Sequence, residues 1–448
     1  MVVIKKQKKL IYIAALCLLL TGCSISSKDN KQPVIDSGKK ITMYVTTDIH
    51  YLAASLHDNG AAYQRYIATS DGRQLNYVTE ITDAFATEVE TQKPDILIVS
   101  GDLTNNGEKD SHLKLAKIFD EIEKKAGTRV FVIPGNHDIE NPWARSIKGE
   151  EQYVTDYISS DDFASIYEEF GYKEAISRDK TTLSYLAAPS KDVWLLMLDT
   201  NVYKTNMKYG APAAYGRIEQ ETLQWIRECS KLAKESNAQM ITVMHHNLLK
   251  HSPVLSYGFT LDNYEEVLEV LEDCDVKLAL SGHIHIQDIK SSKNEETPIY
   301  DVVTSSLSTY PQQYGILEYD PAQGLDYHTN RVDVENWAKS EKLQNEYLLK
   351  FREYSEKYFA DAAYKRIYKQ LKEADLYSEY EIELMSDTVS RLNVNYFAGT
   401  TPFVREEILE TEGYKLWRKA EEPERMVRYV NSMIYDYKID NTKLHISK

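Results

Sequence analysis

Five short hydrophobic runs between residues 41 and 332 each end in polar side chains of the kinds that bind metal ions. The runs are rich in β-branched residues, which is typical of buried strands. The polar residues at their ends are Asp48 and His50, Asp102, Asn136 to Asp138, His245, and His283 with His285. Because ligands bind beyond the carboxyl ends of strands in layered α/β sheets, the pattern predicts one shared site.

The same stretch alternates between two kinds of sequence. Further β-like runs such as "VWLLMLD", "IYDVVTSS" and "GILEYD" are present, and helical stripes separate several of the runs. One such stripe consists of Leu75, Val78, Ile81, Phe85 and Val89. This alternation predicts a layered α/β (α+β) enzyme domain over residues 41–332.

Residues 333–448 have a different texture, without β-like runs and with apolar and Tyr residues at helical spacing. The pattern predicts a separate all-α domain of the size usual for a small domain. Its role stays open between covering an edge of the site, mediating self-association and packing on the core. The apolar stripes favour a core over a recognition surface.

Glycine precedes the polar residues in three of the five runs, at Gly101, Gly135 and Gly282. Glycine lets the chain turn sharply and lets backbone approach an ion or a phosphate. His283 and His285 are two positions apart, so they point the same way on an extended strand. The candidate ligands offer nitrogen and oxygen but no thiolate, which suits Mn, Fe or Zn better than Ca or Mg. Seven ligands are too many for one ion and fit two: Asp48, His50, Asp102, Asn136, His245, His283 and His285.

In this order, the motifs resemble those of the calcineurin-like metallophosphoesterase superfamily. The family motifs D-x-H, G-D-x-x-D, G-N-H-[D/E], a lone H and G-H-x-H stand here as DIH, GDLTN, GNHD, His245 and GHIH. The resemblance implies a metallophosphoesterase β-sandwich flanked by helices over residues 41–332, followed by a C-terminal all-α domain over 333–448. Within the superfamily, "GDLTNNGE" and "PGNHD" look most like class III cyclic nucleotide phosphodiesterases.

The resemblance also implies a role for each motif residue. One ion would be held by Asp48, His50, Asp102 and His285, and the other by Asp102, Asn136, His245 and His283, with Asp102 as the bridge. His137 would face the substrate, stabilise the developing charge and protonate the leaving oxygen, and Asp138 would orient His137. The nucleophile would be metal-bound hydroxide.

The activity that the resemblance implies is hydrolysis of small phosphodiesters, with 3′,5′-cyclic nucleotides as candidate substrates. The same metal centre serves phosphomonoesterases, nucleotidases and protein phosphatases, so hydrolysis of monoesters is the alternative. A third reading is a surface binding lipoprotein whose helical domain is functional and whose core is degenerate. Against it, every candidate ligand and His137 are present.

Three features beside the motifs allow two interpretations each. Asn105 stands where many family members have the second Asp of G-D-x-x-D. It either interacts with residues that hold the metal ligands in place or belongs to a tight turn. His246 either supports its neighbour His245 or contacts substrate. The stretch 51–73 either folds over the metals or is an insertion that plays no part in catalysis.

Residues 1–22 have the pattern of an export signal, in which a lysine-rich start precedes the apolar stretch Leu10 to Leu20. The sequence Leu-Thr-Gly-Cys at residues 20–23 resembles the bacterial lipobox. That resemblance implies a lipid such as palmitate on Cys23 and attachment to the extracytoplasmic face of a bacterial cell membrane. The polar stretch that follows, with Ser, Lys and Pro, predicts a flexible tether over residues 23–40. A plain signal peptide or an N-terminal anchor is the alternative.

The formal charge of −16 argues against a nucleic-acid partner. It also argues against electrostatic attraction to anionic lipid, so membrane attachment would depend on Cys23. Cys229 and Cys274 lie on apolar stripes of helical segments. They are either two buried free thiols or a disulfide, because export permits one.

Overall fold

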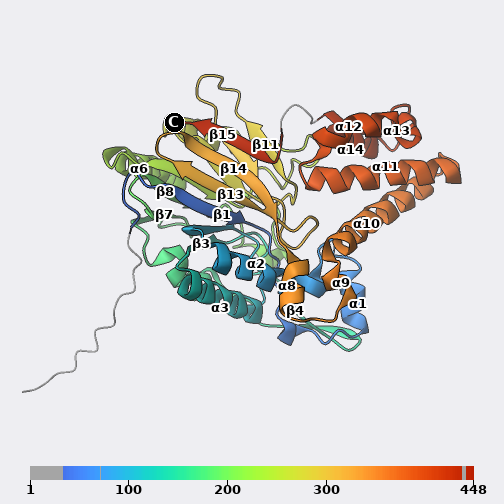
Figure 1. Cartoon of the computed structure of the whole chain (residues 1–448), viewed down its shortest axis with the longest axis horizontal. Helices are drawn as coiled ribbons and strands as arrows, with labels where there is room; N and C mark the ends of the chain where they lie inside the picture. Colours follow the sequence, from blue (N-terminus) through green and yellow to red (C-terminus); the bar gives the residue numbers. More distant parts are fainter. Residues whose placement is uncertain (1–33, 71, 436–439) are drawn as a thin grey trace, which may run out of the picture. The chain divides into compact units, whose positions relative to one another are not determined.

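Two mixed β-sheets form the centre of the protein (Figure 1). The computed structural model describes residues 34–70, 72–435 and 440–448. One sheet has six strands in the order β15-β14-β13-β1-β2-β3, in which β1, β2 and β3 are parallel. Its strands are β1 (Ile41–Thr46), β2 (Ile96–Ser100), β3 (Arg129–Ile133), β13 (Gln313–Asp320), β14 (Gly324–Arg331) and β15 (Lys443–Ser447).

The other sheet has seven strands in the order β11-β12-β10-β9-β8-β7-β6, with β8, β9, β10 and β12 parallel. Its strands are β6 (Ser177–Arg178), β7 (Tyr185–Ala187), β8 (Val193–Leu198), β9 (Gln239–Met244), β10 (Leu278–Ser281), β11 (Asp288–Ser291) and β12 (Tyr300–Val303). A separate hairpin consists of β4 (Arg145–Lys148) and β5 (Glu151–Val154).

The sheets share a core because side chains alternate along each strand. In β8, Leu195 and Met197 pack in one cluster with Val45 of β1, whereas Leu196 and Leu198 pack in a second cluster with helices α6 and α7. Every residue of β8 is buried, since both faces of its sheet are covered. This double burial explains why the run is continuously hydrophobic instead of alternating.

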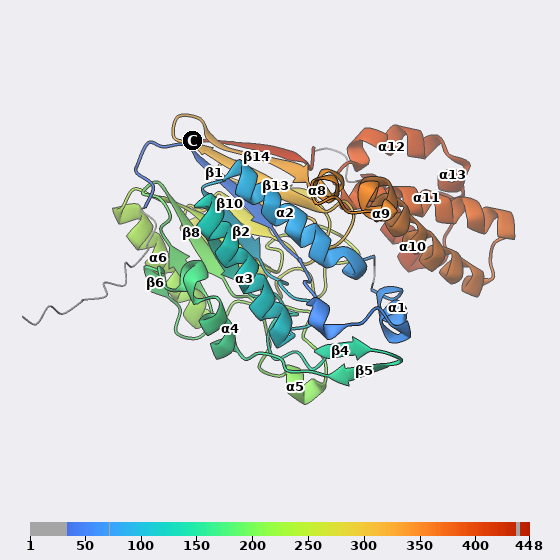
Figure 2. The same cartoon turned by 60° about the horizontal axis from the view of Figure 1, so that its bottom comes forward.

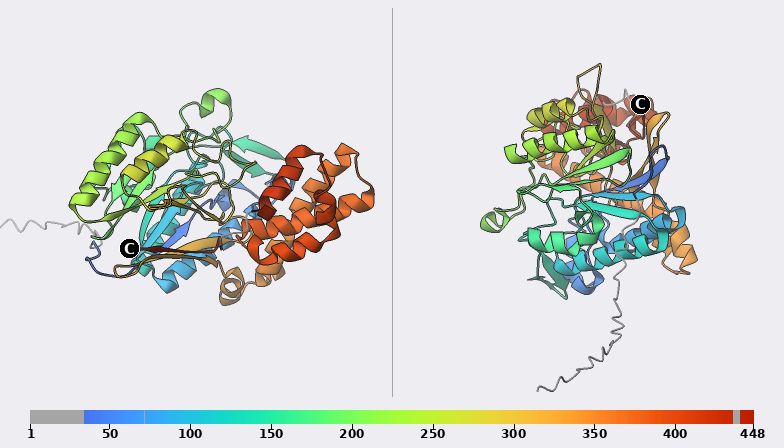
Figure 3. Two further views of the ribbon diagram at one scale, coloured as in Figure 1. Left: turned by 90° about the horizontal axis from the view of Figure 1, so that it is seen from above. Right: turned by 90° about the vertical axis from the view of Figure 1, so that its left-hand side faces the viewer.

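Helices cover the outer faces of both sheets (Figure 3). The helices α2 (Val78–Gln92) and α3 (Lys109–Ala126) lie over the six-stranded sheet, and α6 (Gln220–Glu235) and α7 (Tyr264–Asp273) lie over the seven-stranded sheet. The predicted layered α/β fold, a β-sandwich flanked by helices, is confirmed. The shorter helical elements are η1 (Ala54–Leu56), α1 (Ala61–Ile67), η2 (Leu75–Tyr77), α4 (Ser160–Ile166), η3 (Glu168–Tyr172) and α5 (Asn206–Tyr209).

The predicted C-terminal helical region is also confirmed (Figure 2). Its longest helices meet at a sharp turn, where α10 ends at Asp375 in the left-handed conformation and a capping box at Ser378 begins α11. Its hydrophobic core includes Ile284 and Val303 of the sandwich, so the two regions share packed side chains. The helices are α8 (Val334–Ser340), α9 (Glu346–Leu349), α10 (Phe351–Ala374), α11 (Glu379–Phe397), α12 (Thr401–Glu410), α13 (Glu412–Trp417) and α14 (Glu424–Tyr435).

The structure differs from the sequence-based expectation near both ends of its described residues. The last strand, β15, pairs with β14, although no strand was predicted after residue 332. Its Leu444 and Ile446 alternate with polar residues, which suits an edge strand but is too short a pattern to stand out. Residues 34–40, expected in a flexible tether, contact residues 189–192, where Ile35 exchanges two backbone hydrogen bonds with Pro189 and Lys191.

The structure bears on two of the cysteines and on possible membrane-spanning helices. Cys229 and Cys274 are both unpaired and buried, and burial raises the pKa of the Cys229 thiol to about 12. Cys23, the expected lipidation site, lies outside the described residues, as does the expected signal peptide. Among the described residues, no helix has the length and hydropathy that crossing a membrane requires.

A buried histidine, His251, lies between two aspartates outside the predicted site. Its Nδ1 is 2.7 Å from Oδ2 of Asp288 and its Nε2 is 3.0 Å from Oδ2 of Asp301. Burial lowers the pKa of His251, but the two carboxylates outweigh burial and raise it to about 9. At neutral pH the charged imidazolium therefore joins the loop after β9 to strands β11 and β12.

We expect this imidazolium to make stability depend on pH. Unfolded histidine loses its proton near pH 6.5, whereas folded His251 keeps it up to about pH 9. The stabilisation is complete below about pH 6.5 and is lost as the pH rises through 9, and it amounts to roughly 3 kcal/mol. Urea unfolding at pH 6 and pH 9.5 should show a larger difference between wild type and His251→Gln at pH 6. An equal difference at both pH values would contradict the prediction.

Candidate metal centre

The predicted site residues follow five strands whose carboxyl ends meet between the two sheets. Asp48 and His50 follow β1, Asp102 follows β2, and the Asn136 to Asp138 stretch follows β3, all in the six-stranded sheet. In the other sheet, His245 follows β9, and the histidine pair at residues 283 and 285 follows the adjacent parallel strand β10. The structure thus brings all seven predicted ligands and His137 into one region.

Unusual backbone conformations mark the same residues. A left-handed conformation with φ between +47° and +69° occurs at five of the seven predicted ligands: Asp48, His50, Asp102, His283 and His285. Such conformations are costly for residues other than glycine, and they concentrate at functional sites. Two glycines permit close approach here, because a Cβ on Gly135 would lie 2.1 Å from the Asp102 nitrogen and one on Gly282 would lie 2.1 Å from Thr47 Oγ1.

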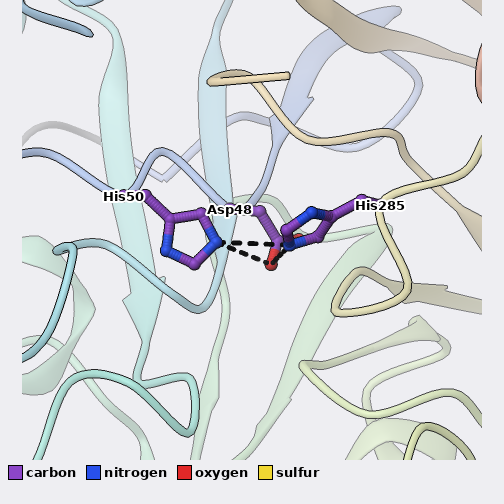
Figure 4. Close-up of side chains that lie close together, drawn as sticks. All are labelled: Asp48, His50 and His285. Carbon is purple, nitrogen blue, oxygen red and sulfur yellow. Dashed lines mark hydrogen bonds and ion pairs between the residues drawn. The ribbon is translucent and has the colours of Figure 1, made fainter. Parts of the chain in front are cut away.

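A first group of potential ligand atoms belongs to Asp48, His50 and His285 (Figure 4). Oδ1 of Asp48 is 3.1 Å from Nε2 of His285 and 3.7 Å from Nε2 of His50, and the two histidine nitrogens are 3.2 Å apart. The other carboxylate oxygen of Asp48 accepts hydrogen bonds from the His283 amide and the Thr47 hydroxyl. The Asp48 side chain is therefore fixed with one oxygen facing the two imidazoles.

A second group consists of Asp102, His245 and His283, with Asn136 beside it. Nε2 of His245 is 3.4 Å from Oδ1 of Asp102 and 3.2 Å from Oδ1 of Asn136. The other oxygen of Asp102, Oδ2, is 3.7 Å from Nε2 of His50 in the first group. Asp102 therefore directs one oxygen to each group, which is the arrangement that a bridging carboxylate requires.

Carbonyl oxygens fix the orientation of two ligand histidines. Nδ1 of His245 donates to the carbonyl oxygen of Ser100 at 3.0 Å, so Nε2 is the nitrogen that faces Asp102. Nε2 of His283 lies 2.8 Å from the Gly258 carbonyl oxygen and 3.0 Å from that of Ala214, so Nε2 carries the proton and Nδ1 is the potential ligand. Such hydrogen bonds behind the ligand are typical of metal-binding histidines.

The donor set fits divalent cations. Oδ1 of Asp48 is buried without a well-aligned hydrogen bond and faces the nitrogens of His285 and His50, so it is an acceptor to which a cation can bind. Burial lowers the pKa of His50 well below its usual value, so its ring is neutral. For His245, burial alone would lower the pKa, but Asp102 and Asp48 raise it to about 9. A proton on His245 thus offsets part of the negative charge of Asp48 and Asp102 in the metal-free centre, and metal binding would displace it.

His137 lies at the open side of the two groups. Its side chain is 19% exposed, whereas those of His50 and His245 are 1% and 0% exposed. Its Nε2 is 4.0 Å from Oδ2 of Asp102. Burial lowers the pKa of His137, and Asp102 partly offsets that effect. The ligand His285 is similarly open, with its side chain 22% exposed, so His137 and His285 lie at the accessible side of the centre.

The expectation that Asp138 orients His137 is corrected by the structure. The carboxylate of Asp138 turns back into the protein and accepts hydrogen bonds at 2.8–3.0 Å from the amides of Leu103, Thr104 and Gly135 and from the Thr104 hydroxyl. Burial and the charge of Asp102 raise the pKa of Asp138 to about 7. Asp138 thus holds the loops after β2 and β3 together and does not reach the His137 ring.

His137 is instead oriented by residues 105 and 106. Its Nδ1 lies 2.8 Å from the carbonyl oxygen of Asn105 and 3.1 Å from Oδ1 of Asn106. The side-chain amides of both asparagines donate to the Tyr66 hydroxyl, and the buried Glu108 accepts from both residues. Burial raises the pKa of Glu108 to about 7. Asn105 therefore acts through its backbone oxygen, and Asn106, which the sequence reasoning missed, supplies the side chain.

Two further predicted features are placed by the structure. His246 is fully buried behind His283, and both rings contact the Ala214 carbonyl oxygen, so His246 has no access to substrate. The stretch 51–73 contributes Tyr66 and also Arg73, whose Nη1 is 3.3 Å from Nδ1 of His50. Neither Tyr66 nor Arg73 belongs to a motif, so no local signal could have identified them.

Two family models match the chain over most of its described length. Residues 41–287 match the calcineurin-like phosphoesterase family, and residues 333–440 match the C-terminal domain of cyclic nucleotide phosphodiesterase. The first match contains all seven predicted ligands and His137. The second match covers the helical region from α8 to α14.

Three curated relatives are 24–25% identical to the chain over less than half of its length. A "Probable cyclic nucleotide phosphodiesterase" of Rhodococcus erythropolis is 25% identical over 43% of this chain and 52% of its own length. The "3',5'-cyclic adenosine monophosphate phosphodiesterase CpdA" of Haemophilus influenzae is 25% identical over 46% of this chain and 59% of its own length. A "Probable glycerophosphodiester phosphodiesterase GpdQ" of Arcobacter nitrofigilis is 24% identical over 43% and 57%. The chain spans about half the length of these relatives. By the family match over residues 41–287, the chain belongs to the calcineurin-like phosphoesterase family.

Proposed function

We propose that the protein is a metal-dependent phosphodiesterase that hydrolyses small phosphodiesters, including 3′,5′-cyclic nucleotides, at a dinuclear centre. The observation that carries the proposal is Asp102, whose two oxygens face separate ligand groups at 3.4 Å and 3.7 Å. The match to the C-terminal domain of cyclic nucleotide phosphodiesterase supports the diester class. So do the relatives, which are named as phosphodiesterases of cyclic nucleotides or of glycerophosphodiesters.

In this proposal the ligand groups hold two ions of Mn, Fe or Zn. Asp48, His50 and His285 would hold one ion and Asn136, His245 and His283 the other, with Asp102 shared. When bound, two such cations neutralise phosphate charge and lower the pKa of a water molecule. The nitrogen and oxygen donors fit this group of metals.

His137 would act at the leaving oxygen. Its Nδ1 is held as a donor to Asn105 and Asn106, so Nε2 is the nitrogen that faces the open side. In the imidazolium form, Nε2 donates its proton to the oxygen that leaves phosphorus. Asp138 keeps the loop that carries His137 against the loop that carries Asp102.

We also propose that a lipid on Cys23 attaches the enzyme to the extracytoplasmic face of the bacterial membrane. The support is the lipobox-like sequence at residues 20–23 after an export-signal pattern. A bilayer would then separate the enzyme from cyclic nucleotides in the cytoplasm. Extracellular nucleotides or envelope phosphodiesters would be its accessible substrates.

The test uses a soluble form that begins at residue 24, stripped of metal and reloaded with Mn. It is assayed on bis(p-nitrophenyl) phosphate, p-nitrophenyl phosphate and 3′,5′-cyclic AMP. We expect faster cleavage of the diesters than of the monoester, and turnover of cyclic AMP places the enzyme among the cyclic nucleotide phosphodiesterases.

The other outcomes contradict the proposal in different ways. Cleavage of the monoester alone would favour a phosphomonoesterase, nucleotidase or protein phosphatase. The absence of cleavage with Mn, Fe or Zn would favour a binding lipoprotein with an inactive core.

A further inference from the structure

His50 differs from His137, His245 and His283 in what lies behind its ring. The nitrogens of His245, His283 and His137 that face away from the centre all donate to carbonyl oxygens. The corresponding nitrogen of His50, Nδ1, faces Nη1 of Arg73 at 3.3 Å. In Figure 4 the other nitrogen of His50 points toward Asp48 and His285, as a ligand nitrogen should.

This contact cannot persist when His50 binds a metal ion through Nε2. A neutral imidazole that binds through Nε2 carries its proton on Nδ1, and a guanidinium has no acceptor for that proton. Two donors would then face each other, so Arg73 must turn its Nη1 away from His50. Among the described residues, no carboxylate forms an ion pair with Arg73 that would hold it elsewhere. Its remaining hydrogen bond runs from Nε to the Ser70 carbonyl oxygen.

We propose that Arg73 binds the phosphate group of the substrate in the metal-loaded enzyme. This inference rests on the proposed phosphodiesterase function. Arginine presents planar pairs of N–H groups that match two oxygens of a phosphate. Among the described residues, no other lysine or arginine side chain hydrogen-bonds a member of the centre. Arg73 is therefore the cationic side chain in contact with the centre.

Arg73 lies behind His50, whose ring is edge-on to the ring of His137 with the centroids 5.1 Å apart. Its charge lowers the pKa of His50 and of His137, in both cases as a smaller effect than burial. It also lowers the pKa of Glu108, where burial is again the larger influence and raises the value. The guanidinium therefore acts electrostatically on both His50 and His137.

Hydrogen bonds connect the segment 72–77, which carries Arg73, to the loop that carries the predicted ligand Asp48. The backbone amide of Gln74 donates to the Ser308 carbonyl oxygen at 2.8 Å. The Ser308 hydroxyl in turn donates to the backbone oxygen of Asp48 at 3.1 Å. Only two hydrogen bonds therefore separate the residue after Arg73 from a predicted metal ligand.

Helix α10 of the C-terminal region holds the same segment from the other side. Nε2 of Gln74 donates to the Ser355 hydroxyl at 2.6 Å, and Ser355 donates to Gln312 at 2.7 Å, with all three side chains buried. Gly72 packs so closely on Phe359 that a Cβ would lie 2.9 Å from its ring. The C-terminal helical region thus contributes to the site by positioning Arg73.

The test compares wild type, Arg73→Gln, Arg73→Lys and Arg73→Ala, all loaded with Mn. Loss of a charged hydrogen bond to phosphate should raise KM for bis(p-nitrophenyl) phosphate and weaken binding of inorganic phosphate about 10- to 100-fold in Arg73→Gln. In Arg73→Lys, the rise in KM and the loss of phosphate affinity should both be smaller. Metal content should stay at the wild-type level, and added guanidinium should partly restore the activity of Arg73→Ala.

Two further variants separate positioning from folding. Ser355→Ala removes the anchor on α10, and it should raise KM in the same direction by a smaller factor. Arg65→Gln, which removes an exposed arginine of α1 paired with Glu150, should behave as wild type. Wild-type phosphate affinity and KM in Arg73→Gln would overturn the proposal, as would an effect explained wholly by lost metal. If wild type cleaves no diester, the proposed function fails, but calorimetric titration with phosphate still decides the role of Arg73.

Discussion

Asp102→Asn is expected to reduce kcat/KM for phosphodiesters roughly 1000-fold or more and to remove metal from the protein. The carboxylate directs one oxygen to each ligand group, so a single substitution weakens both. Asparagine has nearly the same shape but no negative charge and only one oxygen. Transition-state stabilisation by the two cations is worth several kcal/mol, and each 1.36 kcal/mol changes the rate about tenfold.

Metal analysis, activity and thermal unfolding together test this expectation. Mn should raise the melting temperature of wild type, because a ligand that binds only the folded state stabilises it, and should leave Asp102→Asn unchanged. Asp120→Asn is the matched control, since Asp120 is an exposed residue of α3 with a surface partner in Lys124. A variant at Asp102 that keeps two ions and more than about a tenth of the activity would show that Asp102 is not the bridge.

The convergence of the ligands was predictable because strand ends carry it. Parallel strands place their carboxyl ends at one edge, so the residues that follow β1, β2 and β3 had to lie near one another. The same argument applies to His245 and His283 after β9 and β10. Sequence periodicity also identified the helical C-terminal region, since apolar residues recur at helical spacing there.

The contacts that were not predicted depend on how side chains turn within loops or on distant segments. Asp138 follows His137 in sequence, yet its carboxylate bonds to the amides of Leu103 and Thr104 in another loop. No periodic pattern in the sequence encodes this turn of the Asp138 side chain away from His137. Arg73 reaches His50 across 23 residues through a segment that α10 packs against from nearly 300 residues away.

The helical region therefore cannot be understood from its own sequence alone. It contacts the candidate centre at two places, through Ile284, which lies between the two histidines of GHIH, and through the segment that carries Arg73. Both contacts join helices to loops that bear site residues. The C-terminal helices therefore pack on the core and shape the site through the same contacts.

His137→Gln is expected to lower kcat roughly 100- to 10,000-fold with two ions retained, the range typical of a lost general acid. Only its backbone amide contacts Asp102 within hydrogen-bond distance, so the ligand groups should remain in place. The size of the loss should depend on the leaving group. The p-nitrophenolate ion departs readily without a proton, whereas the ribose oxygen of cyclic AMP needs one. Cyclic AMP hydrolysis should therefore decline about tenfold more than that of bis(p-nitrophenyl) phosphate.

His445→Gln is the matched control, since His445 is an exposed histidine on edge strand β15. Its kinetics should equal those of wild type with both substrates. Equal losses for the two leaving groups in His137→Gln would mean that the imidazole stabilises charge on the phosphate without transferring a proton. No loss with either substrate would exclude His137 from the reaction. The leaving-group comparison thus separates proton transfer from electrostatic stabilisation, because only proton transfer depends on the basicity of the departing oxygen.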